Sequence, residues 1–178
     1  MIRFRNDTHA LTVCAMFVAL LVIFSQIAIP LPMGVPINLA LLAVYLCALL
    51  LPLPYALMTV GVYLLLGLLG VPVFAGFRGG PAALFGKTGG YLLGYLLCAL
   101  IVGLLSPKTK GFWQKSLALL AGLFVCYVFG TAWFMRLTNL GLMESLGYCV
   151  FPFLPGDAVK ILLGAGLAGR LGAALQKV

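Results

Sequence analysis

The chain has 178 residues, of which 64% are hydrophobic and only 8% are charged, and its mean hydropathy is +1.21. A soluble domain carries about 25% charged residues, so the composition excludes a soluble globular protein and predicts one integral membrane domain over residues 1–178. The formal net charge is +8, but the eleven Lys and Arg residues are scattered singly near the ends of apolar runs. That distribution is typical of membrane topology signals rather than of a nucleic-acid-binding face, so we expect no nucleic-acid partner.

Six apolar runs follow one another along the chain, at about residues 10–29, 37–51, 55–69, 91–105, 116–135 and 155–175. They predict an all-α membrane protein with six transmembrane helices. The first run has about 20 residues without a charge, enough to cross a hydrocarbon core about 30 Å thick. The second and third have only about 15 residues each, which as helices span about 23 Å. We therefore expect these two helices either to extend into their flanks or to leave room on one side for loops that fold inward.

The first run contains two features that point to contacts. Ala15 and Ala19 are four residues apart, so their small side chains form a shallow groove where another helix can approach closely. That helix can belong to a partner or to this chain. Near the end of the run, Gln26 is a polar group that is costly at membrane depth unless it has a hydrogen-bond partner.

The segment 70–91 is unusual because it combines seven glycines and two prolines with large apolar side chains. Gly and Pro disfavour a helix by about 1 and 3 kcal/mol per interior position. In a membrane protein, irregular backbone is tolerated only against protein or a water-filled cavity. The segment therefore predicts an ordered pocket wall, with a re-entrant turn that only packs as the alternative.

Six spans place both termini on the same side of the membrane. Seven basic residues share that side: Arg3, Arg5, Lys108, Lys110, Lys115, Arg170 and Lys177. The positive-inside rule assigns it to the cytoplasm. The loops at 30–36, 70–90 and 137–154 then lie outside a bacterial cytoplasmic membrane, on the face where a ligand enters, and Ala15 and Ala19 lie in the cytoplasmic half of the first helix.

Polar side chains at two helix starts are candidates for ligand contact. Asn38 opens the second run, where it can cap the helix or present its amide to a ligand. Asp157 and Lys160 are three residues apart at the start of the last run, so they share a helix face. A carboxylate is favoured at a helix N-terminus and a cation is not, so the pair predicts a binding site; the alternative is that Asp157 caps the helix while Lys160 reaches outward.

Other kinds of chemistry have no support in the sequence. It contains no P-loop, no His/Cys metal-ligand spacing and no G-x-S-x-G motif, so we expect no enzyme activity, no metal and no cofactor. The five cysteines are at least 23 residues apart and odd in number, and they indicate small buried apolar residues rather than disulfides: Cys14, Cys47, Cys98, Cys126 and Cys149.

Four segments carry a resemblance to a known family: VPIN at 35–38, GVPVFAG at 70–76, GKTGGY at 86–91 and PFLPGDAVK at 152–160. Together they resemble the BioY family, the biotin-specific substrate-binding (S) components of energy-coupling-factor (ECF) transporters. The sequence departs from the family pattern at Asn38-Leu39-Ala40 and at Lys87. The resemblance implies biotin capture at the extracellular face and transport together with a transmembrane T component and two cytoplasmic ATPases, with Ala15 and Ala19 docking on the T component.

The candidate residues suit the chemistry of biotin, which has a ureido ring, an apolar sulfur ring and a carboxylate tail. Asp157 can accept from the ureido N–H groups, and Lys160 can donate to the ureido carbonyl or to the tail. Five further residues complete the expected site, as ring covers, a tail contact and amide contacts: Phe74, Tyr91, Arg78, Asn38 and Gln26. The alternatives are an S component for a different small vitamin, or a small membrane-embedded enzyme or channel.

Overall fold

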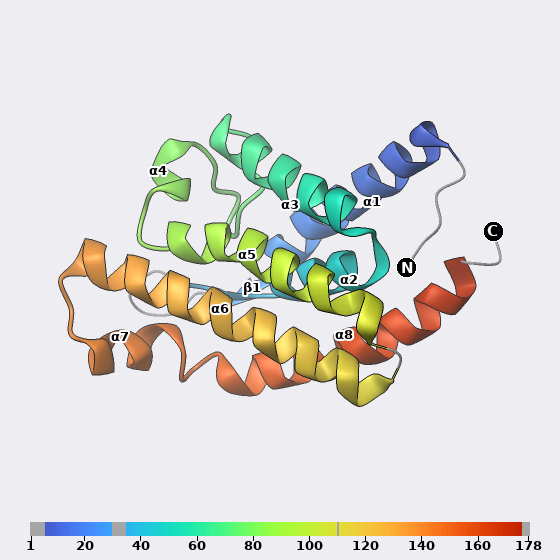
Figure 1. Cartoon of the computed structure of the whole chain (residues 1–178). Coiled ribbons are helices and arrows are strands. Elements are labelled where there is room, and N and C mark those ends of the chain that lie inside the picture. The colour runs from blue at the N-terminus through green and yellow to red at the C-terminus, as the bar shows by residue number, and fades with distance from the viewer. Residues whose placement is uncertain (1–5, 30–34, 110, 176–178) are drawn as a thin grey trace.

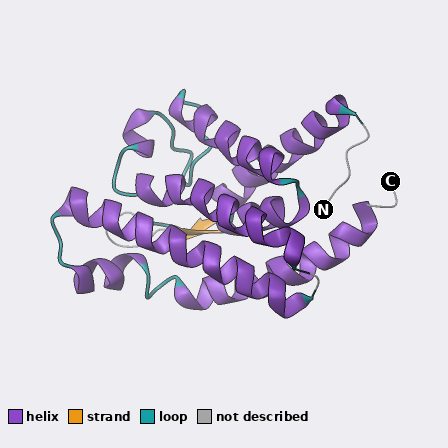
Figure 2. Ribbon diagram, viewed as in Figure 1, coloured by secondary structure: helices purple, strands orange, loops and turns teal. Residues whose placement is uncertain are grey.

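The computed structural model describes residues 6–29, 35–109 and 111–175 (Figure 1). Part of the topology prediction rests on Arg3, Arg5, Lys110 and Lys177, which lie outside these residues, as do residues 30–34 of the first loop. The described part is built on α1 (Asp7–Gln26), α2 (Ala40–Leu50), α3 (Leu53–Leu68), α5 (Gly89–Leu105), α6 (Phe112–Thr138) and α8 (Leu154–Leu175). The predicted all-α class is confirmed, and Figure 2 shows helix over most of the chain.

Short elements occupy the connections. They are α4 (Pro81–Leu84), a 3₁₀ turn (Ser106–Lys108), α7 (Leu142–Cys149) and the antiparallel strands β1 (Ala28–Ile29) and β2 (Ile37–Asn38). The sequence analysis placed both strand segments inside helices, and this was wrong. The reason for β2 is local: the side-chain Oδ1 of Asn38 accepts a hydrogen bond from the Ala40 N–H at 3.1 Å. That bond fixes an extended residue before the helix, so α2 begins only at Ala40.

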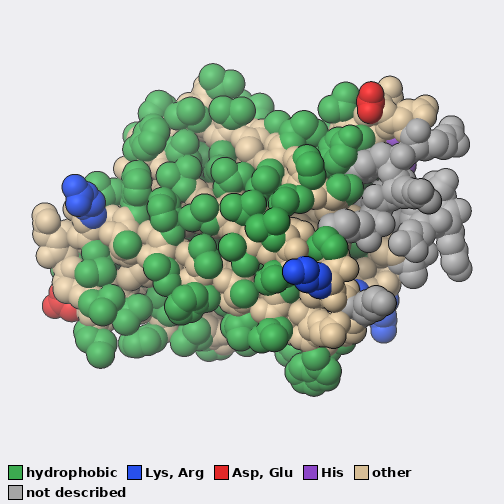
Figure 3. Space-filling model, in the orientation of Figure 1, with side chains coloured by type: hydrophobic (Ala, Val, Ile, Leu, Met, Phe, Trp, Pro, Cys, Tyr) green, Lys and Arg blue, Asp and Glu red, His purple; other side chains and the backbone are tan. Residues whose placement is uncertain are grey.

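Length and composition divide the helices into two groups. Among the described residues, three segments are long and apolar enough to cross a membrane: α1, α5 with its 3₁₀ extension to Lys108, and α6. A fourth results if α7 and α8, which are bent by 53° at their junction, form one span. The remaining two, α2 and α3, are shorter apolar helices. Figure 3 shows hydrophobic side chains over most of the visible face, with few charged ones.

Helix α2 is the centre of the bundle. All eleven of its residues are buried, and it contacts α1, α3, α5 and α8. A helix that is apolar on every side has to be enclosed. The four neighbouring helices provide this enclosure along all eleven residues of α2.

Helices α5 and α6 pack closely because small residues line their contact. A Cβ added to Gly90 would lie 2.3 Å from the Cβ of Trp133, and one added to Gly94 would lie 2.9 Å from the Cys126 Sγ. Both approaches are too short for any larger residue. This close packing fixes the positions of the tyrosines that α5 and α6 contribute to the site.

Candidate functional site

A cavity lies where the Gly89 end of α5 and the Leu154 end of α8 meet β2, α6 and the segment 73–88. It has two adjoining lobes with about 410 and 430 Å³ of space between atoms, including the open space at the mouth. Both lobes are lined by Val35, Pro36, Asn38, Tyr91 and Tyr95. The charged lobe adds Leu41, Cys126, Tyr127, Cys149, Phe153, Asp157 and Lys160. The loop lobe adds Phe74, Ala75, Arg78, Ala83, Thr88 and Leu92.

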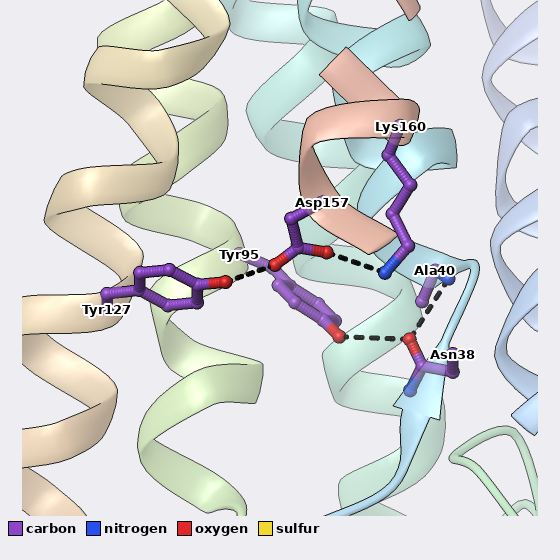
Figure 4. Close-up of polar contacts among 6 residues, drawn as sticks. All are labelled: Asn38, Ala40, Tyr95, Tyr127, Asp157 and Lys160. Atoms are coloured by element: carbon purple, nitrogen blue, oxygen red, sulfur yellow. Dashed lines mark hydrogen bonds and ion pairs between the residues drawn. The ribbon is translucent and has the colours of Figure 1, made fainter. Parts of the chain in front are cut away.

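The charged lobe is built around an ion pair on the first turns of α8 (Figure 4). The Lys160 Nζ lies 2.7 Å from the Asp157 Oδ1, and only 2% of Asp157 and 5% of Lys160 are exposed. On the other side of the carboxylate, the Tyr127 hydroxyl donates to the Asp157 Oδ2. Lys160 therefore does not reach outward, and the capping alternative for the pair is wrong on this point.

The ion pair keeps capacity for further bonds. Each carboxylate oxygen of Asp157 accepts one side-chain hydrogen bond and can accept another, and the ammonium of Lys160 has three donors. Removing two charges from water is costly, and a buried ion pair contributes little to stability compared with apolar side chains of similar volume. A buried Asp–Lys pair that lines a cavity is therefore a candidate for ligand contact.

Asn38 stands between the two lobes. Its Oδ1 accepts from the Ala40 N–H at 3.1 Å and from the Tyr95 hydroxyl at 3.4 Å (Figure 4). Asn38 is therefore not the N-cap of α2, which is Leu39, but its side chain bonds the first N–H of the helix from one residue further back. Because the amide oxygen is occupied, the NH₂ group is the part of this side chain that can serve a ligand.

Aromatic rings and one exposed cation form the rest of the wall. Tyr91 lies in both lobes and its hydroxyl is 2.9 Å from the Thr131 Oγ1. Phe74 is buried in the loop lobe and packs edge-to-face against Tyr63, with ring centroids 5.4 Å apart. Arg78 is exposed at the edge of the loop lobe, where its Nε donates to the Ala75 carbonyl at 3.1 Å.

Gln26 is the member of the expected set that the structure places elsewhere. It lines neither lobe. Its amide nitrogen donates to the carbonyls of Val73 and Phe74 at 3.1 and 3.2 Å, and its amide oxygen accepts from the Phe77 N–H at 3.0 Å. The partner that the sequence required for this side chain is the 73–77 backbone. Asn38, Phe74, Arg78, Tyr91, Asp157 and Lys160 do come together in the cavity.

Two tyrosines of the cavity were missed by the sequence analysis. Tyr95 follows Tyr91 by four residues, so the shared helix face was a signal that could have identified it. Tyr127 lies 30 residues before Asp157 in an apolar run, and nothing in its local sequence marks it. Lys87, where the sequence departs from the family pattern, is exposed and lines neither lobe.

The small-residue pair on α1 is accessible. Ala15 and Ala19 are both exposed, so they are not used for packing between the described helices. They straddle the middle of α1, which runs from Asp7 to Gln26. The expectation that both lie in the cytoplasmic half of the helix is therefore corrected, because α1 begins earlier and ends earlier than the apolar run suggested.

The cysteines behave as the sequence predicted. All five are buried and none is in a disulfide. Among the described residues, no group of three or more His, Cys, Asp or Glu side chains is arranged to hold a metal ion.

Comparison with known proteins assigns the family. The model of the BioY family matches residues 2–177. The "Biotin transporter BioY" of Thermotoga maritima is 37% identical over 155 residues, covering 87% of this chain and 90% of that protein. The Lactococcus lactis "Biotin transporter BioY" is 31% identical over 176 residues, covering 94% and 92%. A solved S-component for biotin from an ECF-type ABC transporter superposes with a TM-score of 0.88 at 27% identity, covering 96% of this chain and 94% of that one. The chain therefore belongs to the BioY family.

Proposed function

We propose that this chain is the biotin-capturing S component of an ECF-type transporter and holds biotin in the two-lobed cavity. The observation that carries the proposal is the buried Asp157–Lys160 pair with Tyr127 at one end of a cavity lined by aromatic rings. The family and its relatives named as biotin transporters support the same ligand.

The ureido ring belongs in the charged lobe. A urea group presents N–H donors beside a carbonyl acceptor, and Asp157 and Lys160 present an acceptor beside a donor 2.7 Å away. Charge-assisted hydrogen bonds are roughly twice as strong as neutral ones. The ureido group is itself neutral, so it adds no charge to a buried pair that is already balanced.

The valerate tail belongs in the loop lobe. Placed in the charged lobe, the tail carboxylate would face Asp157 and repel it. At the other end of the cavity, Arg78 offers a guanidinium in an exposed position, where a charged tail keeps part of its hydration. The rings of Phe74 and Tyr91 then cover the apolar part of the ligand between the two polar ends.

Titration of the detergent-purified protein with biotin tests the proposal. Saturable binding of biotin, and no binding of other vitamins of similar size, is the expected result. Biotinamide, which lacks the charged tail, should bind to the wild-type protein more weakly than biotin does. The Arg78→Ala variant should bind biotin and biotinamide with equal affinity. Binding of another vitamin with no response to biotin would establish the alternative S component instead.

We infer the orientation in the membrane from the distribution of basic residues along the sequence. The cavity lies at the Gly89 end of α5, while Lys108 follows the Leu105 end. A Cβ added to Gly169 would lie 3.8 Å from the Lys115 Nζ, so the second half of α8 lies beside the first turn of α6. This separation supports cytoplasmic termini and an extracellular cavity, in a bacterial cytoplasmic membrane with lipid around the bundle.

Single cysteines at positions 78 and 108 test this orientation. A membrane-impermeant thiol reagent added to intact cells should label Arg78→Cys and leave Lys108→Cys unlabelled until the cells are opened. The parent protein is the control, since its five cysteines are buried. Labelling of both variants from outside contradicts the orientation.

Energy for transport comes from partners in this proposal. The chain itself has no nucleotide-binding motif, so we assign ATP hydrolysis to two cytoplasmic ATPases and their coupling to a transmembrane T component. The exposed Ala15 and Ala19 on α1 are the surface we assign to the T component.

A further inference from the structure

The wall of the loop lobe is formed by a small hairpin, residues 74–78. The Phe74 N–H donates to the Arg78 carbonyl at 2.9 Å, and the Arg78 N–H donates to the Phe74 carbonyl at 3.2 Å. Phe74, Ala75 and Arg78 all line the lobe. The shape of the loop lobe therefore depends on where this hairpin sits and on whether it stays closed.

The hairpin contains a backbone conformation that its sequence does not favour. Gly76 and Phe77 have φ of 72° and 55°. Glycine adopts the left-handed region readily, but a bulky side chain does not. Phe77 is 74% exposed, so burial within the protein does not compensate for the conformation. Such outliers persist only when the surrounding structure holds them.

The group that holds Phe77 comes from α1. The Gln26 Oε1 accepts from the Phe77 N–H at 3.0 Å, and the Gln26 Nε2 donates to the carbonyls of Val73 and Phe74 at 3.1 and 3.2 Å. The one side-chain amide of Gln26 thus bonds the backbone on both sides of the turn, at Val73 and at Phe77, which are 47 and 51 residues away in sequence. The neighbouring Ser25 adds a second bond to the Val73 carbonyl, at 2.5 Å.

We propose that Gln26 is a positioning residue for ligand capture: it fixes Phe77 in its left-handed conformation and thereby aims Phe74 and Arg78 into the cavity. This inference rests on the proposed function, because the ligand that meets those two side chains is biotin. Gln26 itself touches no ligand. An amide is required at position 26, because the turn presents an N–H and two carbonyls together.

The test compares the effect of Gln26→Leu in three backgrounds: the wild type, F77G and F77A. F77G removes the ring and the strain, whereas F77A removes the ring but keeps the Cβ that disfavours the left-handed region. We expect Q26L to weaken biotin binding by about tenfold in the wild type and in F77A, and by about threefold or less in F77G. Gln26→Glu should weaken biotin binding as much as Q26L does, since a carboxylate cannot donate to the two carbonyls.

A second measurement does not need the ligand. Hydrogen–deuterium exchange of peptides that cover residues 73–79 should speed up at least tenfold in Q26L and Q26L/F77A, and should return toward the wild-type rate in Q26L/F77G. If the wild-type protein does not bind biotin, the proposed function fails while exchange still decides the role of Gln26. Equal effects of Q26L in all three backgrounds, in binding and exchange, overturn the proposal, as does a Q26L variant that behaves like the wild type.

Discussion

Lys160→Ala and Asp157→Asn are each expected to weaken biotin binding by at least about tenfold, which is 1.4 kcal/mol. Removing one partner leaves the other charge buried with a lost hydrogen bond, a change that typically costs about 3–5 kcal/mol in proteins. It also removes a charged contact to the ureido group. Titration calorimetry of the purified variants measures the loss, and thermal unfolding reports whether each variant is still folded.

Two further variants separate recognition from folding. Tyr127→Phe removes the hydroxyl bonded to Asp157 but no charge, so its effect on binding should be smaller, about 0.5–1.5 kcal/mol. The double variant Asp157→Asn with Lys160→Met leaves no unpaired charge, so it should unfold near the wild-type temperature and still bind biotin at least tenfold more weakly. Wild-type affinity in the double variant would mean that the pair serves the fold and not the ligand.

Replacing Ala15 and Ala19 together by Leu or Trp should abolish assembly with the T component and reduce ATP-driven biotin uptake to background. In lipid, large apolar side chains do little to favour helix association, whereas small residues favour it because they let two helices approach closely. Both alanines are exposed on α1, and bulky side chains there would keep a partner helix at a distance. Co-purification from membranes that contain all components measures assembly directly.

Capture and assembly should be separable in this variant. Neither alanine lines the cavity, so the isolated bulky variant should bind biotin with the wild-type affinity. Ala15→Ser with Ala19→Ser is the matched control, because it alters both positions, keeps them small and should assemble normally. Intact assembly of the bulky variant would exclude this surface as the docking site. Loss of biotin binding in the isolated variant would mean that Ala15 and Ala19 are needed for the fold instead.

The sequence alone was sufficient for properties that depend on neighbouring residues. Apolar composition and run length identified an α-helical membrane protein, because every backbone group in lipid has to be bonded within a helix or a closed barrel. The placement of Asp157 and Lys160 on one helix face follows from their three-residue spacing, whereas the structure showed that the two side chains pair. The need of Gln26 for a partner follows from the cost of an unbonded amide at membrane depth.

Tertiary structure decided which groups meet across the chain. Tyr127 and Asp157 are 30 residues apart, Asn38 and Tyr95 are 57 apart, and each pair is joined by a hydrogen bond. The same holds for Gln26: the sequence showed that it needs a partner, and only the fold supplied the 73–77 backbone in place of a ligand. The physical reason is that periodicity and spacing describe which residues share a face of one helix, whereas the neighbour of that face is set by how all the helices pack around α2.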